Sequence, residues 1–178
     1  MKELKELIRD IACEIGRTLG AKCSIETELV EDELIYNEPA PVTDLLRISR
    51  SEFLAEMAKV GIKPIDLETP LDSFMTITSE IELERIAPYL VYPADLYIAE
   101  IWDCEDYAIQ AQCDAALKFH VSSIRLGLGQ MPLGYHGFPV TLSKEGNIWL
   151  LDSNAGFPYA GGWFRIGDNG YNPNKIFV

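Results

Sequence analysis

The chain has 178 residues, of which 48% are hydrophobic and 24% charged, enough for one domain with a sizeable core. A net charge of −13 disfavours direct binding to nucleic-acid phosphates and suits solubility, a cation or a basic partner. No segment has the length and apolarity of a membrane span or of a signal-peptide core, so we expect a cytoplasmic protein without a membrane partner.

The N-terminal third predicts one long helix followed by a surface segment. Leucine and isoleucine recur at helical spacing over 2–19, and Gly20 is a plausible stop. Residues 24–36 are acidic and partly β-branched, which suits a surface hairpin.

Two shorter helices are expected before residue 90. The first fits 51–60, ends near Gly61 and turns three apolar side chains inward, Phe53, Leu54 and Met57. Ser79 and Glu82 have the spacing of a capping box, which predicts a second helix running to about Ala87.

A third helix is predicted over 104–119. Asp103 is a suitable N-cap, and two acidic residues follow in the first turn, where the helix dipole favours negative charge. Small residues at spacings of three and four, Ala108, Ala111 and Ala115, form a face that can lie close against a sheet.

Strand candidates follow this helix. Alternation with period two, or a short apolar run, marks five segments: 124–128, 136–142, 147–152, 163–166 and 175–178. Helices followed by antiparallel strands favour an α+β fold over a dinucleotide-binding one. We therefore expect a single domain over 1–178, with a helical and irregular part at 1–94 and a catalytic core at 95–178.

Cys104 is the candidate nucleophile because it stands at the start of the third helix. The unpaired amides and the dipole of a helix N-terminus favour a thiolate, which is the reactive form of cysteine. A buried structural cysteine is the alternative at this position. The four cysteines include no Cys-x-x-Cys pair, which disfavours zinc binding and thioredoxin-like chemistry.

Only two histidines are available as the base. His120 lies at the far end of the helix that Cys104 begins, about 24 Å away at ~1.5 Å per residue, too far to share a proton. His136 begins a strand whose same-face neighbours are apolar, so it points toward the core and toward whatever the helix presents. We therefore expect His136 to be the base.

Asp152 ends an apolar run and is the candidate for orienting the imidazole. A carboxylate there must find a partner or suffer a large desolvation penalty, and an imidazole N–H would satisfy it. Asn154 is the alternative orienting residue, and a plain turn over 152–156 would need neither role.

Three carboxylates surround the thiol, namely Asp103, Glu105 and Asp106. Negative charge beside a cysteine raises the thiol pKa and opposes its activation. These groups therefore either cap the helix and point away, or are neutralised by a cation, for which calcium has the preferred oxygen chemistry.

The sequence from Asp103 to Ala108, followed by His136 and Asp152, resembles the bacterial transglutaminase-like cysteine peptidases of the papain/transglutaminase superfamily. The segment from Trp102 to Tyr107 is also similar to the papain-like domain of calcium-activated fungal agglutinins. The resemblance covers about 95–178. It implies an α+β fold in which a core helix packs on an antiparallel sheet.

By the same resemblance, Cys104 is the nucleophile, His136 the base and Asp152 the orienting acid. It also implies calcium at Asp103, Glu105 and Asp106. The leading hypothesis is a thiol-dependent hydrolase of a peptide or amide bond, a cysteine peptidase or amidase with a protein or peptide substrate. The alternatives are a catalytically silent cation- or protein-binding module on the same fold, and an acidic interaction protein in which Cys104 is incidental.

Overall fold

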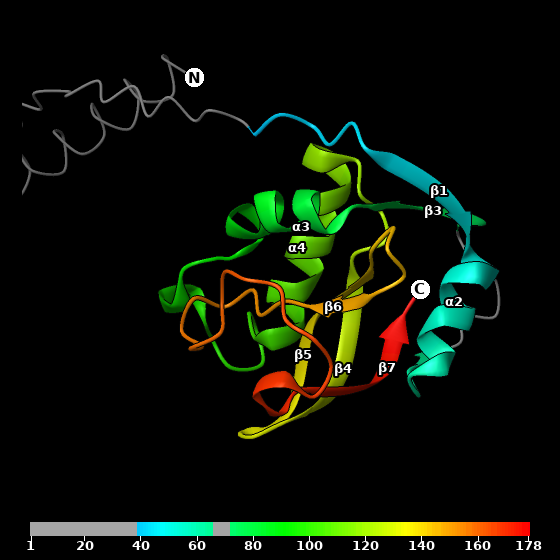
Figure 1. Cartoon of the computed structure of the whole chain (residues 1–178). Coiled ribbons are helices and arrows are strands. Elements are labelled where there is room, and N and C mark those ends of the chain that lie inside the picture. The colour runs from blue at the N-terminus through cyan, green and yellow to red at the C-terminus, as the bar shows by residue number, and fades with distance from the viewer. Residues whose placement is uncertain (1–38, 66–71) are drawn as a thin grey trace, which may run out of the picture. The chain divides into compact units, whose positions relative to one another are not determined.

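The structure is a computed structural model that describes residues 39–65 and 72–178. The chain divides into two compact units, 1–37 and 38–178, and the second unit is described here (Figure 1). The expected helix over 2–19 and hairpin over 24–36 lie outside the described residues.

A five-stranded mixed sheet forms the centre of this unit, with the strand order β2-β7-β4-β5-β6. All its pairings are antiparallel except β2 with β7, which is parallel. The strands are β2 (Lys63–Ile65), β4 (Arg125–Met131), β5 (Gly134–Leu142), β6 (Ile148–Leu150) and β7 (Asn172–Phe177). The alternation seen in the sequence over 124–128 and 136–142 therefore predicts β4 and β5 correctly, with boundaries shifted by a few residues.

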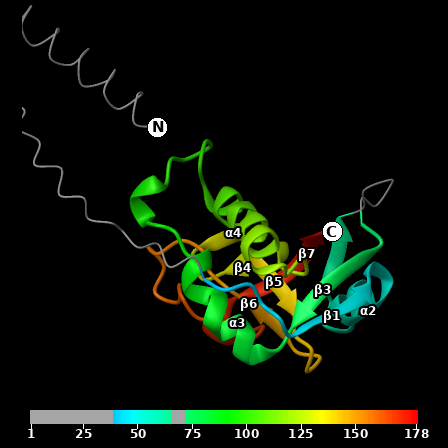
Figure 2. The same ribbon diagram turned by 90° about the horizontal axis from the view of Figure 1, so that it is seen from above.

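Helix α4 (Cys104–Phe119) packs against β4 and β5, as Figures 1 and 2 show. Its predicted bounds and its small-residue face are confirmed, because Ala108, Ala111 and Ala115 have no exposed surface. Alanines on this face let the helix axis approach the sheet closely and place the N-terminus of the helix beside the edge of β5.

A second, two-stranded sheet pairs β1 (Leu45–Ser49) with β3 (Phe74–Thr78) in antiparallel register. Helix α2 (Arg50–Lys59) follows β1 directly and confirms the predicted helix over 51–60; its N-cap Ser49 forms a capping box with Glu52. The buried side chains of α2, Phe53 and Met57, belong to the same core cluster as Phe138 and other apolar residues of β5.

Helix α3 (Glu80–Ile86) is present as predicted, but the expected capping box is wrong, because the Ser79 side chain makes no capping hydrogen bond. The Glu80 carboxylate instead accepts hydrogen bonds from Asn147 and Trp149 near β6. A 3₁₀-helix, η1 (Ala87–Leu90), continues α3, and two further 3₁₀-helices are η2 (Ala94–Leu96) and η3 (Asp168–Gly170).

The predicted fold class, α+β of the papain/transglutaminase-like type with helices ahead of an antiparallel sheet, is wrong. Seven strands accompany three α-helices in the described residues, β1 precedes the first of these helices, and β2 and β3 stand between the helices. The parallel pairing of β2 with β7 makes the main sheet mixed. Local periodicity missed β1, β2 and β3 because partners distant in the sequence stabilise them.

The expected strand over 163–166 is also wrong, since only one bridge, between Leu150 and Phe164, forms there. Within 39–65 and 72–178, none of the helices combines the length and apolarity needed to cross a bilayer.

Candidate functional site

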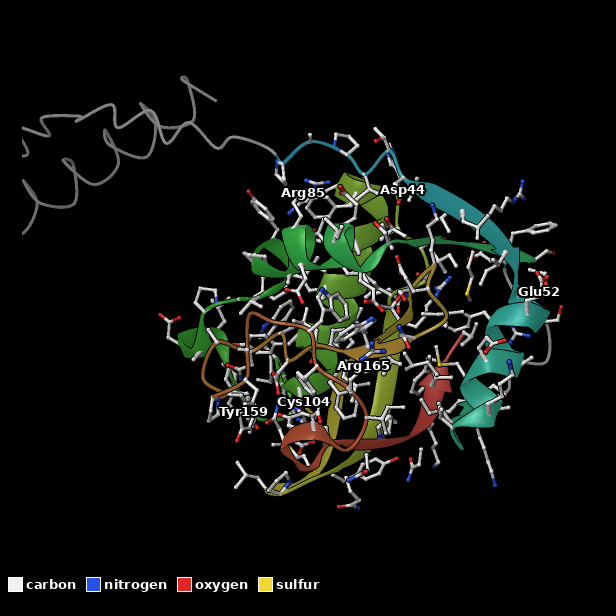
Figure 3. All side chains as sticks on the ribbon, viewed as in Figure 1. Asp44, Glu52, Arg85, Cys104, Tyr159 and Arg165 are labelled. Carbon is white, nitrogen blue, oxygen red and sulfur yellow. The ribbon has the colours of Figure 1, made fainter. Side chains whose placement is uncertain are left out.

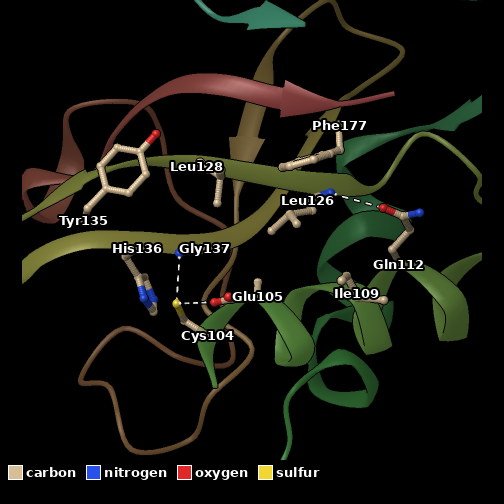
Figure 4. A pocket seen from close by; sticks show the side chains of 10 residues that line it. All are labelled: Cys104, Glu105, Ile109, Gln112, Leu126, Leu128, Tyr135, His136, Gly137 and Phe177. Carbon is tan, nitrogen blue, oxygen red and sulfur yellow. Dashed lines mark hydrogen bonds between the residues drawn. The ribbon is translucent and has the colours of Figure 1, made fainter. Parts of the chain in front are cut away.

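Cys104 is the first residue of α4 and lies at the edge of β5 (Figures 3 and 4). Strand β6 pairs only with Val140–Leu142, which leaves the earlier part of β5 open on that edge. The Gly137 amide of this open part donates a hydrogen bond to the Cys104 Sγ at 3.3 Å. Gly137 permits this approach because a Cβ there would lie 3.1 Å from the Glu105 Cα.

Burial raises the pKa of the Cys104 thiol to about 11. The Gly137 amide lowers it, whereas the Glu105 carboxylate, which accepts a hydrogen bond from the thiol at 3.2 Å, raises it further. The thiol is therefore protonated at neutral pH in this arrangement. It needs a base, or a cation beside Glu105, to react as a thiolate.

His136 and Asp152 form a buried pair behind the thiol. The His136 Nε2 and the Asp152 Oδ2 are 3.0 Å apart, and the two residues are only 6% and 2% exposed. The other carboxylate oxygen of Asp152 accepts the backbone N–H of Asn154 at 3.1 Å. Asp152 can therefore hold the imidazole in one orientation and tautomer.

Tyr171, at the entrance to β7, completes this pair and was missed by sequence reasoning. Its hydroxyl donates to the Asp152 Oδ2 at 2.7 Å, and the ring is fully buried. Burial and the neighbouring Asp152 raise the pKa of Tyr171, so the hydroxyl keeps its proton and acts as a donor. No spacing in the sequence marks a tyrosine 19 residues after its aspartate.

Aromatic rings enclose the His136 imidazole on several sides. The ring centroid of Phe157 lies 4.8 Å away, that of Phe138 5.9 Å and that of Tyr171 6.1 Å. This packing adds to the restraint that the hydrogen bond to Asp152 places on the imidazole.

The imidazole and the thiol line the same cleft, and Figure 4 shows the His136 side chain beside that of Cys104. The hydrogen-bond partners of the thiol are Gly137 and Glu105, and His136 is not one of them. Since Nε2 faces Asp152, Nδ1 is the nitrogen left to take a proton from the cleft.

His120 is the C-cap of α4, as its spacing from Cys104 predicted.

Asn154, the alternative orienting residue, lies close by in a different role. Its side-chain oxygen accepts the Gly156 amide at 2.8 Å, while its backbone supports Asp152. In this geometry the carboxylate that holds the imidazole belongs to Asp152.

The acidic residues beside the thiol divide into two sets. One ligand atom each of Asp103, Cys104 and Glu105 lie within 4.8 Å of one another. Asp106 is outside this group, and its carboxylate accepts the Asp103 amide at 3.2 Å as a helix cap. Hydrogen bonding between Asp103 and Glu105 raises the pKa of Asp103 and lowers that of Glu105, as expected of two carboxyl groups that share one proton.

Comparisons with known proteins show similarity in fold alone. No family model matches the chain, and no curated protein matches it. One similar solved structure is described as a PSL1a-E64 complex, with a TM-score of 0.52, 15% identity and coverage of 75% of this chain and 51% of that chain. Another is Polyporus squamosus lectin bound to the human-type influenza-binding epitope Neu5Aca2-6Galb1-4GlcNAc, with a TM-score of 0.52, 14% identity and coverage of 75% and 50%. The chain thus spans about half the length of these structures.

These findings correct the predicted family and activity. The similar structures are described as a lectin and its complexes, not as papain/transglutaminase-like peptidases, and no family model supports that superfamily. The predictions of a cysteine peptidase or amidase, and of hydrolysis of a peptide or amide bond, are therefore wrong as well. The alternative of a binding module is nearer to the findings, although the ligand described for the lectin is a sugar epitope rather than a cation or a protein.

Proposed function

We propose that this chain is a ligand-binding protein whose cleft carries a nucleophilic thiol, with Cys104 as nucleophile, His136 as base and Asp152 as orienting acid. The observation that carries the proposal is the buried His136–Asp152 pair beside a thiol on the same cleft. Removing a carboxylate and an imidazole from water costs free energy, which their hydrogen bond offsets only in part. A pair buried in this way is suited to hold a proton acceptor in a fixed orientation.

In this proposal the Cys104 sulfur attacks an electrophilic carbon of the ligand. The S–C bond forms while the bond to the leaving group breaks, and the leaving group takes that electron pair. The thiol proton passes to the free ring nitrogen of His136, and Asp152 stabilises the resulting imidazolium. The Gly137 amide, which already contacts the sulfur, favours negative charge on it as the proton leaves.

Alkylation rates of the two described cysteines test the proposal. The full-length protein is treated with iodoacetamide near neutral pH, and labelling of Cys104 and of the exposed Cys113 is followed by peptide mass spectrometry. We expect His136→Gln to slow Cys104 labelling about tenfold or more, and Asp152→Asn to slow it less. Labelling of Cys113 should be unchanged.

The matched control is His120→Gln, which alters the other histidine at the opposite end of α4. Equal Cys104 rates in the wild type and in His136→Gln would overturn the proposal.

We further propose that calcium binds beside the thiol through Asp103 and Glu105. Two observations support this: ligand atoms of Asp103, Cys104 and Glu105 lie within 4.8 Å of one another, and the Asp103 Oδ1 is buried without a hydrogen-bond partner. Asp106, the third predicted ligand, would contribute only by giving up its helix-capping hydrogen bond. A cytoplasmic location remains a prediction.

A further inference from the structure

The cleft extends from Cys104 in two directions, and the two arms differ in character. Both arms are lined by Cys104, Tyr135 and His136, so they meet at the thiol. The arm between α4 and β4, called the apolar arm below, has a volume of about 630 Å³, and the other has about 450 Å³. Volumes of this size are typical of pockets for small ligands, roughly 300–1,000 Å³.

The apolar arm is built from side chains at regular spacings, as Figure 4 shows. Glu105, Ile109 and Gln112 share one face of α4 at i, i+4 and i+7, and Leu126 and Leu128 share one face of β4 at i and i+2. The lining residues beyond the thiol are Ile109, Gln112, Leu126, Leu128 and Phe177.

Gln112 is the one polar side chain on this face of α4 beyond Glu105; its oxygen accepts the Leu126 amide at 3.1 Å, and its Nε2 group is left as a donor. Ile109 and Phe177 are 43% and 37% exposed, so both keep accessible apolar surface. Apart from Glu105 and the thiol and imidazole themselves, no side chain that lines the arm is ionisable near neutral pH. A hydrocarbon group that covers this surface would remove it from water, which lowers the free energy of the complex.

The second arm has a more mixed lining, in which Asn154 stands beside apolar residues such as Met131, Leu133 and Phe157. Asn154 lines it, and since its side-chain oxygen is taken by the Gly156 amide, its Nδ2 group is free to donate. An apolar chain attached to the reacting carbon fits the first arm better than the second, because the surface that lines the first arm is the more apolar of the two.

We infer that the ligand of Cys104 carries an apolar chain next to its electrophilic carbon, and that the arm formed by Ile109, Leu126, Leu128 and Phe177 selects this chain. The inference rests on the proposed function of Cys104. It adds the chemical class of the ligand, which the thiol and imidazole alone leave open.

A series of N-alkyl iodoacetamides tests the inference on the full-length protein. In each, the sulfur displaces iodide, which leaves with the electron pair of the C–I bond, and the thiol proton is released. The measured quantity is the second-order rate of Cys104 labelling for the methyl, butyl and octyl reagents. We expect at least a tenfold rise from methyl to octyl, since the added methylenes bury apolar area in the arm. Cys113, an exposed thiol on the same helix, should show a flat series.

Ile109→Gln should remove most of the octyl-to-methyl ratio by placing a polar group in the wall of the arm. The matched control is Leu117→Gln, the same kind of change on α4 at a residue that is 77% exposed and does not line either arm. It should keep the wild-type ratio.

The results can distinguish a failure of the apolar-chain inference from a failure of the proposed function. A flat series at Cys104, with labelling that still depends on His136, would overturn the apolar-chain inference and leave the proposed function standing. A ratio that persists in Ile109→Gln, or one shared equally by Cys113, would also overturn it. Slow labelling independent of His136 with every reagent would overturn both.

Discussion

Asp152 receives its two strongest hydrogen bonds from residues on different strands, His136 of β5 and Tyr171 at the entrance to β7. Both bonds end on Oδ2, while the Asn154 N–H binds Oδ1, so both oxygens of the carboxylate that orients the imidazole are fixed by hydrogen bonds. Tyr171 is thus a positioning residue, which acts on the thiol through Asp152 and His136.

Tyr171→Phe should lower the free energy of unfolding by about 1–3 kcal/mol, because it leaves a buried carboxylate with an unmet hydrogen bond. Cys104 alkylation should slow severalfold at the same time. Urea denaturation and the iodoacetamide rate measure the two effects. Tyr89→Phe, at a half-exposed ring, is the control and should change neither quantity. A stability loss with an unchanged Cys104 rate would mean that Tyr171 only supports the fold.

The Glu105 carboxylate raises the pKa of a thiol that burial already brings to about 11. Glu105→Gln removes that negative charge, so the Cys104 pKa should fall. The pH profile of Cys104 alkylation should then move to lower pH, with faster labelling between roughly pH 7 and 9. Glu84→Gln, at an exposed carboxylate on α3, should leave the profile in place. A profile unmoved by Glu105→Gln would show that the carboxylate does not control the thiol.

Calcium should neutralise the negative charge of the Glu105 carboxylate. Titration of metal-free protein should release or absorb measurable heat, and the melting temperature should rise with the logarithm of calcium excess. Cys104 labelling should accelerate with calcium and slow with a chelator, because a cation beside Glu105 favours the thiolate. Asp103→Asn should weaken all three effects. Millimolar calcium without heat or a melting shift would leave these carboxylates as helix caps.

At the scale of elements, a close contact between backbones joins β4 and β7, the strands that carry Leu128 and Phe177 of the cleft. Strands β4 and β7 shift register between Leu128 and Gly129, and at Gly129 the two backbones come close together. A Cβ at Gly129 would overlap the Asn172 carbonyl oxygen and lie 2.5 Å from the Pro173 Cα. Neither backbone atom can rotate away as the end of a side chain can.

Gly129→Ala should therefore destabilise the protein by several kcal/mol, or prevent folding, by forcing β4 and β7 apart. Gly162→Ala is the matched control, because a Cβ there meets no atom within 4 Å and the backbone needs no positive φ. Thermal unfolding of the two variants measures the difference. Equal melting temperatures would contradict the close approach of β4 and β7.

At the scale of the whole molecule, two core clusters hold the unit over 38–178 together. One gathers Phe53 and Met57 of α2 with apolar residues of β5 and β7, and the other joins α3 and η1 to α4. Both clusters combine residues before and after position 94, so the part expected to be irregular contributes directly to the packing around the site.

Residues 38–178 should therefore fold without the first unit. A chain that begins at residue 38 should unfold in one cooperative transition and keep His136-dependent labelling of Cys104. Circular dichroism in the near and far ultraviolet, together with the labelling rate, measures this. Retained helix signal with lost near-ultraviolet signal would mean that 1–37 is needed for tertiary packing.

The sequence by itself determined the local features of this protein. Period-3.6 and period-2 patterns predicted α4, β4 and β5, because the burial of one face of each element repeats along the chain. The position of Cys104 at a helix start and the exclusion of His120 followed from helix geometry. The predicted family, fold class and hydrolase activity were wrong, since a short motif with spaced residues does not determine how the elements assemble.

The tertiary structure alone decided the rest. The strands β1, β2 and β3, the hydrogen bond from Tyr171 to Asp152 and the contact of the Gly137 amide with Cys104 all join residues far apart in the sequence. Their partners satisfy backbone groups and buried charges that local propensity cannot anticipate. The apolar arm beside the thiol is also a feature that only the tertiary structure decided. Its walls come from α4, β4, β5 and β7 together, and none of these elements forms it alone.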